Sequence, residues 1–172
     1  YSHLADLQAC LVGEVPRSVV ARAGALKEPP QWERLSVISE YPGGALSVGD
    51  LCLFAYGAGA EYPFEVIGEK GRLVGDIVKD RLTLWTHKAE PEDLSPVRGP
   101  VPIRGFPGTR ELMREFVDCV RRRRERPTSG LAQGLAAVEV CLAIEESVEA
   151  GQPASVRWDA ASTGASGKRR RG

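Results

Sequence analysis

The feature that most restricts the fold of this chain is a series of short strand-like segments between residues 17 and 86. Turn sequences separate neighbouring segments, among them Pro-Gly-Gly at residues 42–44 and Gly-Glu-Lys-Gly at residues 68–71, where glycine adopts positive φ without steric cost. Short strands joined by such turns are typical of an antiparallel or mixed sheet. The predicted strands are residues 17–25, 34–41, 45–56, 64–67, 72–76 and 81–86.

Three segments around this series have the apolar spacing of amphipathic helices. Residues 3–12 are predicted to be the end of a helix, with Gly13 as its left-handed C-cap. Two further helices are predicted over residues 109–126 and 130–150. The expected core-facing stripes are Leu4, Leu7 and Leu11; then Leu112, Met113, Phe116 and Val120; then Leu131, Leu135, Val138 and Leu142.

This order of elements predicts an α+β domain, built on a large mixed, mostly antiparallel open sheet with helices packed on one face. The other sheet face must then be covered by a second domain, by a partner subunit, or by both. We expect this domain to span residues 1–158. Residues 88–108 hold five prolines and are expected to be an exposed connection with little regular structure. A short closing strand is expected near residues 156–158. The Ala, Ser, Gly and basic composition of residues 159–172 predicts a disordered tail.

The charge balance restricts the partners of the chain. Its 172 residues hold 23 Lys and Arg against 23 Asp and Glu, and this zero net charge argues against a dedicated nucleic-acid binder. The arginine-rich residues 121–126 are expected to lie in the last turns of a helix, as a solvated face. No apolar run approaches the roughly 20 residues of a membrane span, and no leader opens the chain, so we expect a cytoplasmic location. Because the chain begins at Tyr1 without Met, we expect a processed chain or the back part of a longer one.

The cysteines and histidines argue against a metal centre. His3 and His87 are the two imidazoles and lie far apart in sequence, and no pair of cysteines has metal-ligand spacing. The cysteines have apolar neighbours and are predicted to be buried, reduced thiols, although the sequence leaves a disulfide pair open. They are Cys10, Cys52, Cys119 and Cys141.

Three motifs in chain order resemble a known family. Residues 3–13 read H-x-x-D-x-x-x-x-L-x-G and are followed by Val-Val-Ala at residues 19–21. Residues 64–73 contain a G-x-x-G hairpin, and residues 116–151 contain Phe-Val, Arg-Pro, Gly-Leu, Glu-Ser and a closing Gly. Together they resemble the Gfo/Idh/MocA oxidoreductases, relatives of glucose–fructose oxidoreductase and inositol dehydrogenase. Each motif alone is weak, but the three occur in the family's order across residues 3–158.

The resemblance implies only the second half of such an enzyme. Family members have an N-terminal Rossmann domain for NAD or NADP, and a C-terminal domain like that of glyceraldehyde-3-phosphate dehydrogenase. The chain resembles the C-terminal domain, because Gly57-Ala58-Gly59 lacks the third glycine of G-x-G-x-x-G. The family's catalytic lysine also belongs to the other half. We therefore expect the cofactor to be bound mainly by an N-terminal domain, and the isolated chain to be inactive.

The resemblance also implies site residues. Oxidation of a secondary alcohol needs a group to take the hydroxyl proton, which suits a histidine because its pKa lies near neutrality. The family's histidine matches His3, and the alternative is a capping or solvated histidine at a helix terminus. Asp6 is expected to be a structural acid. Glu61 and Tyr62 match a substrate-contacting position to within a residue, and the alternative for Tyr62 is a loop aromatic that packs on the sheet.

The resulting function hypothesis is a substrate and oligomerisation domain of an NAD(P)-dependent oxidoreductase. Its substrate would be a sugar, a polyol or a related hydroxy or carbonyl compound, and copies would pair into a dimer or tetramer through the sheet face. The alternative is a non-catalytic interaction module that uses the same exposed sheet face. Nucleic-acid binding through the arginines is a third hypothesis, and the balanced charge argues against it.

Overall fold

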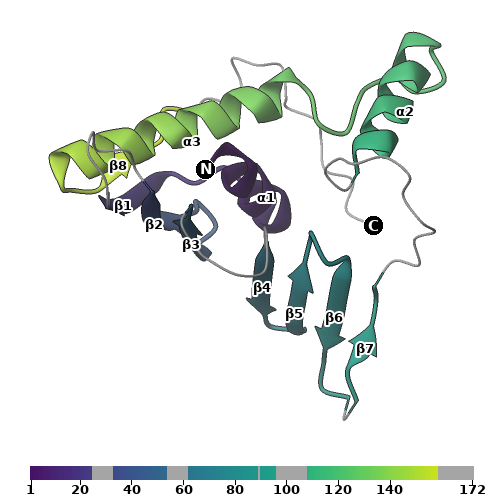
Figure 1. Ribbon diagram of the computed structural model, residues 1–172, viewed down its shortest axis with the longest axis horizontal. Coiled ribbons are helices and arrows are strands. Elements are labelled where there is room, and N and C mark those ends of the chain that lie inside the picture. The colour runs from purple at the N-terminus through teal and green to yellow at the C-terminus, as the bar shows by residue number, and fades with distance from the viewer. Residues whose placement is uncertain (25–32, 54–61, 89, 96–107, 159–172) are drawn as a thin grey trace. The chain divides into compact units, whose positions relative to one another are not determined.

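The computed structural model describes residues 1–24, 33–53, 62–88, 90–95 and 108–158 (Figure 1). Three helices and eight strands occur in these residues, and every described strand pair is antiparallel. The predicted α+β class is confirmed. The strands hydrogen-bond into two four-stranded sheets, one in each of two compact units. Unit 1 comprises residues 1–55 and 128–172, and unit 2 comprises residues 56–127.

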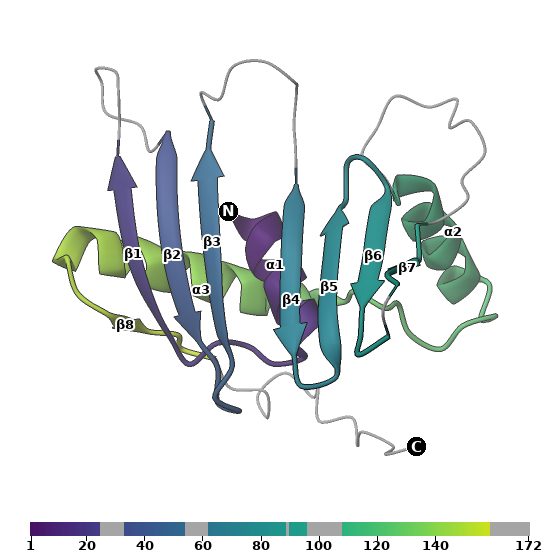
Figure 2. The same cartoon turned by 90° about the horizontal axis from the view of Figure 1, so that it is seen from below.

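Unit 1 is a sheet with two helices on one face (Figure 2). The helices are α1 (Ser2–Val12) and α3 (Leu131–Ala150). The strands, in spatial order, are β3 (Leu46–Cys52), β2 (Arg34–Glu40), β1 (Ser18–Gly24) and β8 (Ala154–Ser155). The closing strand β8 lies just before the predicted residues 156–158, and Val156 adds a backbone hydrogen bond to the Arg17 carbonyl of 2.9 Å.

Alternation along the strands builds the core of unit 1. Val19 and Ala21 of β1 and Leu35 and Val37 of β2 point to the helix side and are almost fully buried. They form one cluster with small and branched residues of α1 and α3, which let the helices approach the sheet closely. The α1 and α3 members of this cluster are Ala5, Val140, Ala143 and Ile144.

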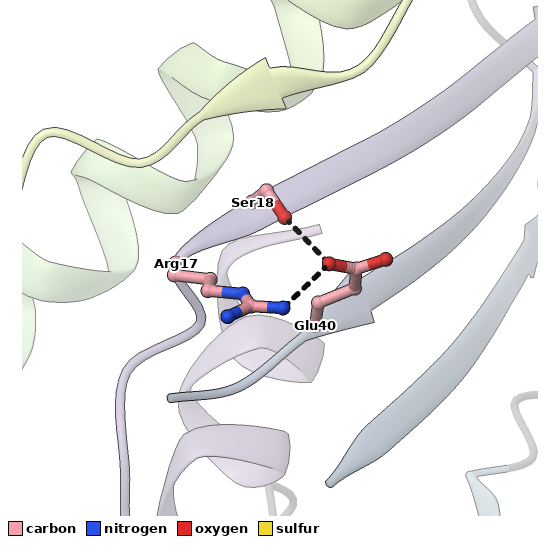
Figure 3. Close-up of polar contacts among 3 residues, drawn as sticks. All are labelled: Arg17, Ser18 and Glu40. Carbon is pink, nitrogen blue, oxygen red and sulfur yellow. Dashed lines mark hydrogen bonds and ion pairs between the residues drawn. The ribbon is translucent and has the colours of Figure 1, made fainter. Parts of the chain in front are cut away.

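The opposite face of this sheet is open within the described residues. Val20, Ile38 and Val48 lie directly across from one another on three neighbouring strands, and Val48 is 74% exposed. At one end of the face the Glu40 carboxylate accepts hydrogen bonds from Ser18 at 3.2 Å and from Arg17 at 3.3 Å (Figure 3). This face therefore presents an apolar row beside a polar cluster whose hydrogen bonds are satisfied.

Unit 2 contains a hairpin-rich sheet and one helix. Glu69 and Lys70 form a two-residue turn between the first two strands, as the G-x-x-G sequence predicts. The strands, in spatial order, are β4 (Pro63–Gly68), β5 (Gly71–Asp76), β6 (Arg81–Trp85) and β7 (Glu92–Asp93), and the helix is α2 (Thr109–Val120). The short strand β7 corrects the expectation of an irregular connection over its residues, because it hydrogen-bonds to β6.

Helix α2 ends at Val120, six residues earlier than predicted. Arg122 adopts a left-handed conformation with φ 56°, and the backbone turns back on itself there. Arg124 reaches the Glu115 carboxylate at 2.9 Å. The predicted placement of the arginines in the last turns of a helix is therefore wrong, since four neighbouring like charges are better separated beyond the helix.

The ends of α1 and α3 agree with the sequence, but the buried face of α3 does not. Gly13 and Gly151 are left-handed C-caps with φ 78° and 66°. The predicted core stripe of α3 instead points to solvent within the described residues, and Leu131 is 91% exposed. The apolar stripe of α2 is exposed in the same way. The buried face of α3 is Ala136, Ala137, Val140, Ala143, Ile144 and Ser147.

Candidate functional site

Helix α1 is held against β3 by a close approach and a short chain of hydrogen bonds. Gly49 is buried, and a Cβ atom at this position would overlap the Tyr1 hydroxyl and crowd Leu4. The Tyr1 hydroxyl donates to the Gln8 side-chain oxygen at 3.2 Å, and the Gln8 amide donates to the Val48 carbonyl at 3.3 Å. Burial raises the pKa of the Tyr1 phenol far above its usual value, so this hydroxyl stays protonated. The sheet therefore fixes the rotation of α1 about its axis.

This rotation leaves His3, Asp6 and Cys10 on the face of α1 that points away from the sheet. Their spacing of three and four residues places them on one side of a helix, and all three are exposed. Ala5 on the opposite side is buried in the core. The structure thus presents His3 outward at the first turn of α1, where a substrate or a neighbouring domain can reach it.

A pocket of about 670 Å³ lies beside this face, between α1 and α3. Its walls are mostly apolar, with a few polar groups, and Asp6 and Cys10 line it from α1 while Gln133 lines it from α3. Glu14 also lines it, and its carboxylate accepts the Gly43 backbone N–H at 2.9 Å. His3 is not a lining residue. The pocket therefore adjoins the exposed face of α1 through Asp6 and Cys10.

The other two predicted site residues belong to unit 2. Glu61 lies outside the described residues. Tyr62 is half-buried directly before β4, and its carbonyl accepts the Ile77 N–H at 3.2 Å. Asp76 lies beside it: burial alone would raise the pKa of this carboxyl, but hydrogen bonds from the backbones of Lys79, Val78 and Tyr62 and the Lys79 charge lower it. The backbone at Tyr62 is therefore anchored at the end of the β4–β5 ladder.

The cysteines differ from the sequence-based expectation. All four are free thiols, but Cys10 and Cys52 are exposed rather than buried. The flanking leucines of Cys52 suggested burial, yet strand alternation places Cys52 on the open sheet face. Among the residues that the structure describes, no group of three or more His, Cys, Asp or Glu side chains could hold a metal ion. Within the same residues, no helix is long and apolar enough to cross a membrane.

Comparison with protein families identifies the fold. The family model described as the C-terminal α/β domain of the Gfo/Idh/MocA oxidoreductase family matches residues 1–156. The chain belongs to the Gfo/Idh/MocA oxidoreductase family. The match covers both units and every described helix and strand. The family resemblance of the three sequence motifs is therefore confirmed.

Solved structures share the fold of this Gfo/Idh/MocA domain. An oxidoreductase domain protein from Kribbella flavida superposes with a TM-score of 0.77 at 21% identity, over 91% of this chain and 48% of that one. The WlbA dehydrogenase from Bordetella pertussis, in complex with NADH and UDP-GlcNAcA, superposes with a TM-score of 0.70 at 21% identity, over 92% of this chain and 44% of that one. Levoglucosan dehydrogenase, in complex with NADH and levoglucosan, superposes with a TM-score of 0.74 at 17% identity, over 91% of this chain and 49% of that one.

The chain thus spans about half the length of the solved structures that it matches. No match was found among the sequences of curated proteins. The chain therefore has the Gfo/Idh/MocA C-terminal fold.

Two parts of the candidate site were not predicted from the sequence. The pocket residues Cys10 and Gln133 carry no motif, although the spacing of His3, Asp6 and Cys10 already places them on one helix face. The pocket itself follows from small residues on α3, where Ala132 and Ala136 leave room beside α1. Small residues opposite a polar helix face are the signal that would have indicated it.

Proposed function

We propose that this chain is the C-terminal substrate and oligomerisation domain of a nicotinamide-dependent oxidoreductase. Its substrate class is a sugar, a polyol or a related hydroxy or carbonyl compound. Family membership over residues 1–156 supports the reaction class. Two structures of the same fold support the substrate class, since they are dehydrogenases bound to NADH and to UDP-GlcNAcA or levoglucosan.

The observation that carries this proposal is the outward placement of His3 on α1. A neutral imidazole accepts the proton of a substrate hydroxyl when that alcohol is oxidised, and returns it in the reverse direction. His3 is exposed at the first turn of α1, on the side away from the sheet, and Asp6, about one helical turn further along the same face, lines a pocket with both apolar and polar walls. Asp6 follows it by three residues on the same helix face.

The chain's own sequence does not fit a dinucleotide. It contains no G-x-G-x-x-G, so NAD or NADP would be held mainly by an N-terminal domain, and the isolated chain would be inactive. The nicotinamide supplies the hydride acceptor or donor when it is bound. Residues 1–158 would contribute His3 to the proton transfer, and Glu61 and Tyr62 to the binding of substrate.

The test uses the complete gene product with a panel of sugars and polyols and either nicotinamide cofactor. His3→Gln is expected to lower kcat about 10²- to 10⁴-fold, because the proton acceptor is lost. His87→Gln is the matched control, since His87 is also an exposed histidine, and it should leave kcat unchanged. A gene product that turns over none of the panel, or whose kcat does not fall with His3→Gln, would contradict the proposal.

A second candidate function is supported by the open face of the unit 1 sheet. The apolar row of Val20, Ile38 and Val48 suits a surface that associates with another protein chain. In that case the domain would be a non-catalytic interaction module. Self-association through this row, together with a gene product that binds neither NADH nor NADPH, would favour the module over the enzyme.

A further inference from the structure

The side-chain amide of Gln8 is hydrogen-bonded at both of its ends, and it joins α1 to the sheet of unit 1. Its oxygen accepts the Tyr1 hydroxyl at 3.2 Å, and its nitrogen donates to the Val48 carbonyl of β3 at 3.3 Å. Tyr1 is the N-cap of α1, seven residues and about two turns before Gln8, so the two side chains lie on the same face of the helix. One amide therefore connects two turns of α1 to one point of a strand.

The chemistry of the three groups leaves this amide one orientation. A backbone carbonyl can only accept, so the amide nitrogen has to face Val48 and the amide oxygen has to face Tyr1. Burial raises the pKa of the Tyr1 phenol, which keeps its hydroxyl available as the donor. Gly49 confines the amide further, because a Cβ atom at this position would lie 3.1 Å from the Gln8 nitrogen and would overlap the Tyr1 hydroxyl. The link between α1 and β3 is therefore directional.

This link differs in kind from the apolar contacts on the same side of α1. Ala5 is buried in the core, and Leu4 lies next to Gly49. Burial of apolar surface is non-directional, so these contacts hold α1 close to the sheet but restrict its rotation less. A hydrogen bond favours a narrow range of distances and angles, so the Gln8 amide defines the rotation of α1 about its own axis.

The rotation of α1 determines where His3 points. His3 lies five residues before Gln8, which places it about 140° around the helix, on the face away from the sheet. A side-chain atom about 6 Å from the helix axis moves by about 2 Å when the helix rotates by about 20°. A misplacement of about 1 Å at a reacting group lowers a rate by as much as about 10²-fold. A group that restricts this rotation therefore affects proton transfer without contacting the substrate.

We infer that Gln8 is a positioning residue of the oxidoreductase, which joins α1 to β3 and thereby holds His3 in the direction that proton transfer needs. The inference rests on the proposed function, in which His3 takes and returns the proton of the substrate hydroxyl. Gln8 lies on the sheet side of α1, so it acts through the helix and not on the substrate.

The test compares two glutamine variants of the complete gene product, with the substrate that the panel identifies. Gln8→Met keeps a side chain of similar length and removes both hydrogen bonds. Gln152→Met is the matched control, at an exposed position just beyond α3 in the same unit. Gln8→Met should lower kcat about 10- to 100-fold with KM unchanged, because the lost contact positions the reacting group and does not bind substrate. Gln152→Met should leave both constants unchanged.

Two further measurements separate positioning from a purely structural role. Hydride transfer is followed in single turnovers through the absorbance of the reduced nicotinamide, so that product release does not mask the effect. All assays are run well below the unfolding midpoint of each variant, and the folded fraction is measured in the same buffer. Tyr1→Phe removes one of the two hydrogen bonds and keeps the ring, so it should slow hydride transfer less than Gln8→Met does, and it tests the inference if Gln8→Met fails to fold.

Three results would overturn the inference. Hydride transfer at the wild-type rate in Gln8→Met would show that the amide does not position His3. A raised KM with an unchanged kcat would show that Gln8 contributes to substrate binding instead. A loss of activity no larger than the loss of folded protein would leave the amide a structural role alone. The proposed function is tested separately: if His3→Gln lowers kcat and Gln8→Met does not, this inference alone fails, whereas full activity of His3→Gln refutes both.

Discussion

The Ser147 hydroxyl of α3 accepts the backbone N–H of Ala21 in the middle of β1, at 2.9 Å. The same hydroxyl donates to the carbonyl of Gln152 beyond the end of the helix, at 2.6 Å. Ser147 is 0% exposed. One buried hydroxyl thus satisfies a strand donor that has no ladder partner there, because β8 pairs with β1 only at Ser18 and Val19.

Replacement of this hydroxyl should destabilise unit 1. Ser147→Ala leaves the Ala21 N–H buried and unpaired, which costs about 1–3 kcal/mol of unfolding free energy. Ser147→Thr keeps the hydroxyl and should recover part of the loss. Ser155→Ala, at an exposed position of β8, should change the stability by less than about 0.5 kcal/mol. Urea unfolding followed by circular dichroism measures all three, and equal midpoints for Ser147→Ala and Ser155→Ala would refute the prediction.

Gly49 determines how closely α1 lies on β3. Gly49→Val would push a branched side chain into the Tyr1 hydroxyl and Leu4, which should cost about 1–3 kcal/mol by overpacking. Because α1 carries His3, kcat of the complete gene product should fall as well. Gly24→Ala is the control, since nothing lies within 4 Å of a Cβ there. A thermal unfolding midpoint of Gly49→Val equal to that of Gly24→Ala would show that α1 is not held by this approach.

The elements that the sequence predicted well are those for which one pattern has one structural solution. Gly13 ends α1 because a left-handed residue is needed there. Gly71 follows the Glu69-Lys70 turn with a positive φ of 156°, and a Cβ atom at this position would overlap the Trp85 carbonyl. Strand alternation likewise explains why Val19 and Val37, both in predicted strands, lie in the core. In each case the local sequence alone determines the backbone.

The orientation of the helices could not be predicted in this way. Periodicity selects a buried face only when the opposite face is polar, and α3 is apolar on both. The spacing of Leu131, Leu135 and Leu142 predicted that these residues face the core. The sheet instead packs against the face of α3 that contains smaller residues, among them Ser147, whose hydroxyl accepts the Ala21 N–H. The rotation of α1 had a similar cause. The missing side chain of Gly49 lets the side of α1 that contains Tyr1 and Gln8 lie close to β3. In this rotation Ala5 is buried and Leu11 is 37% exposed.

Asp76 should make unit 2 sensitive to acid. The backbone N–H groups of Val78 and Lys79 donate to its carboxylate at 2.9 and 3.0 Å, and its pKa is lowered in the folded state despite the opposing effect of burial. A lowered folded pKa adds stability above the unfolded pKa of about 3.9, and this stability is lost as the pH falls through the folded value. Asp76→Asn keeps an acceptor oxygen but removes the charge.

Stability against urea, measured between pH 7 and pH 2 for the wild type and Asp76→Asn, tests this expectation. The wild type should be the more stable protein at pH 7, and the difference should shrink below about pH 4. Parallel profiles over the whole range would show that the charge of Asp76 adds nothing to the fold.

Self-association should depend on the open face of the unit 1 sheet and not on the exposed apolar residues of α3, such as Leu135 and Leu142. Ile38 and Val48 lie directly opposite each other, so Ile38→Glu with Val48→Glu places two like charges side by side in an apolar row. The dissociation constant between copies should rise at least about tenfold, since a charged pair cannot be desolvated there without a partner. Leu135→Glu with Leu142→Glu is the control, because it introduces the same two charges at exposed apolar positions on the helix side of the unit. Sedimentation velocity over a dilution series measures the dissociation constant of each variant. If the sheet-face variant has an unchanged dissociation constant, or if the helix-side variant dissociates, copies associate through the helix side instead.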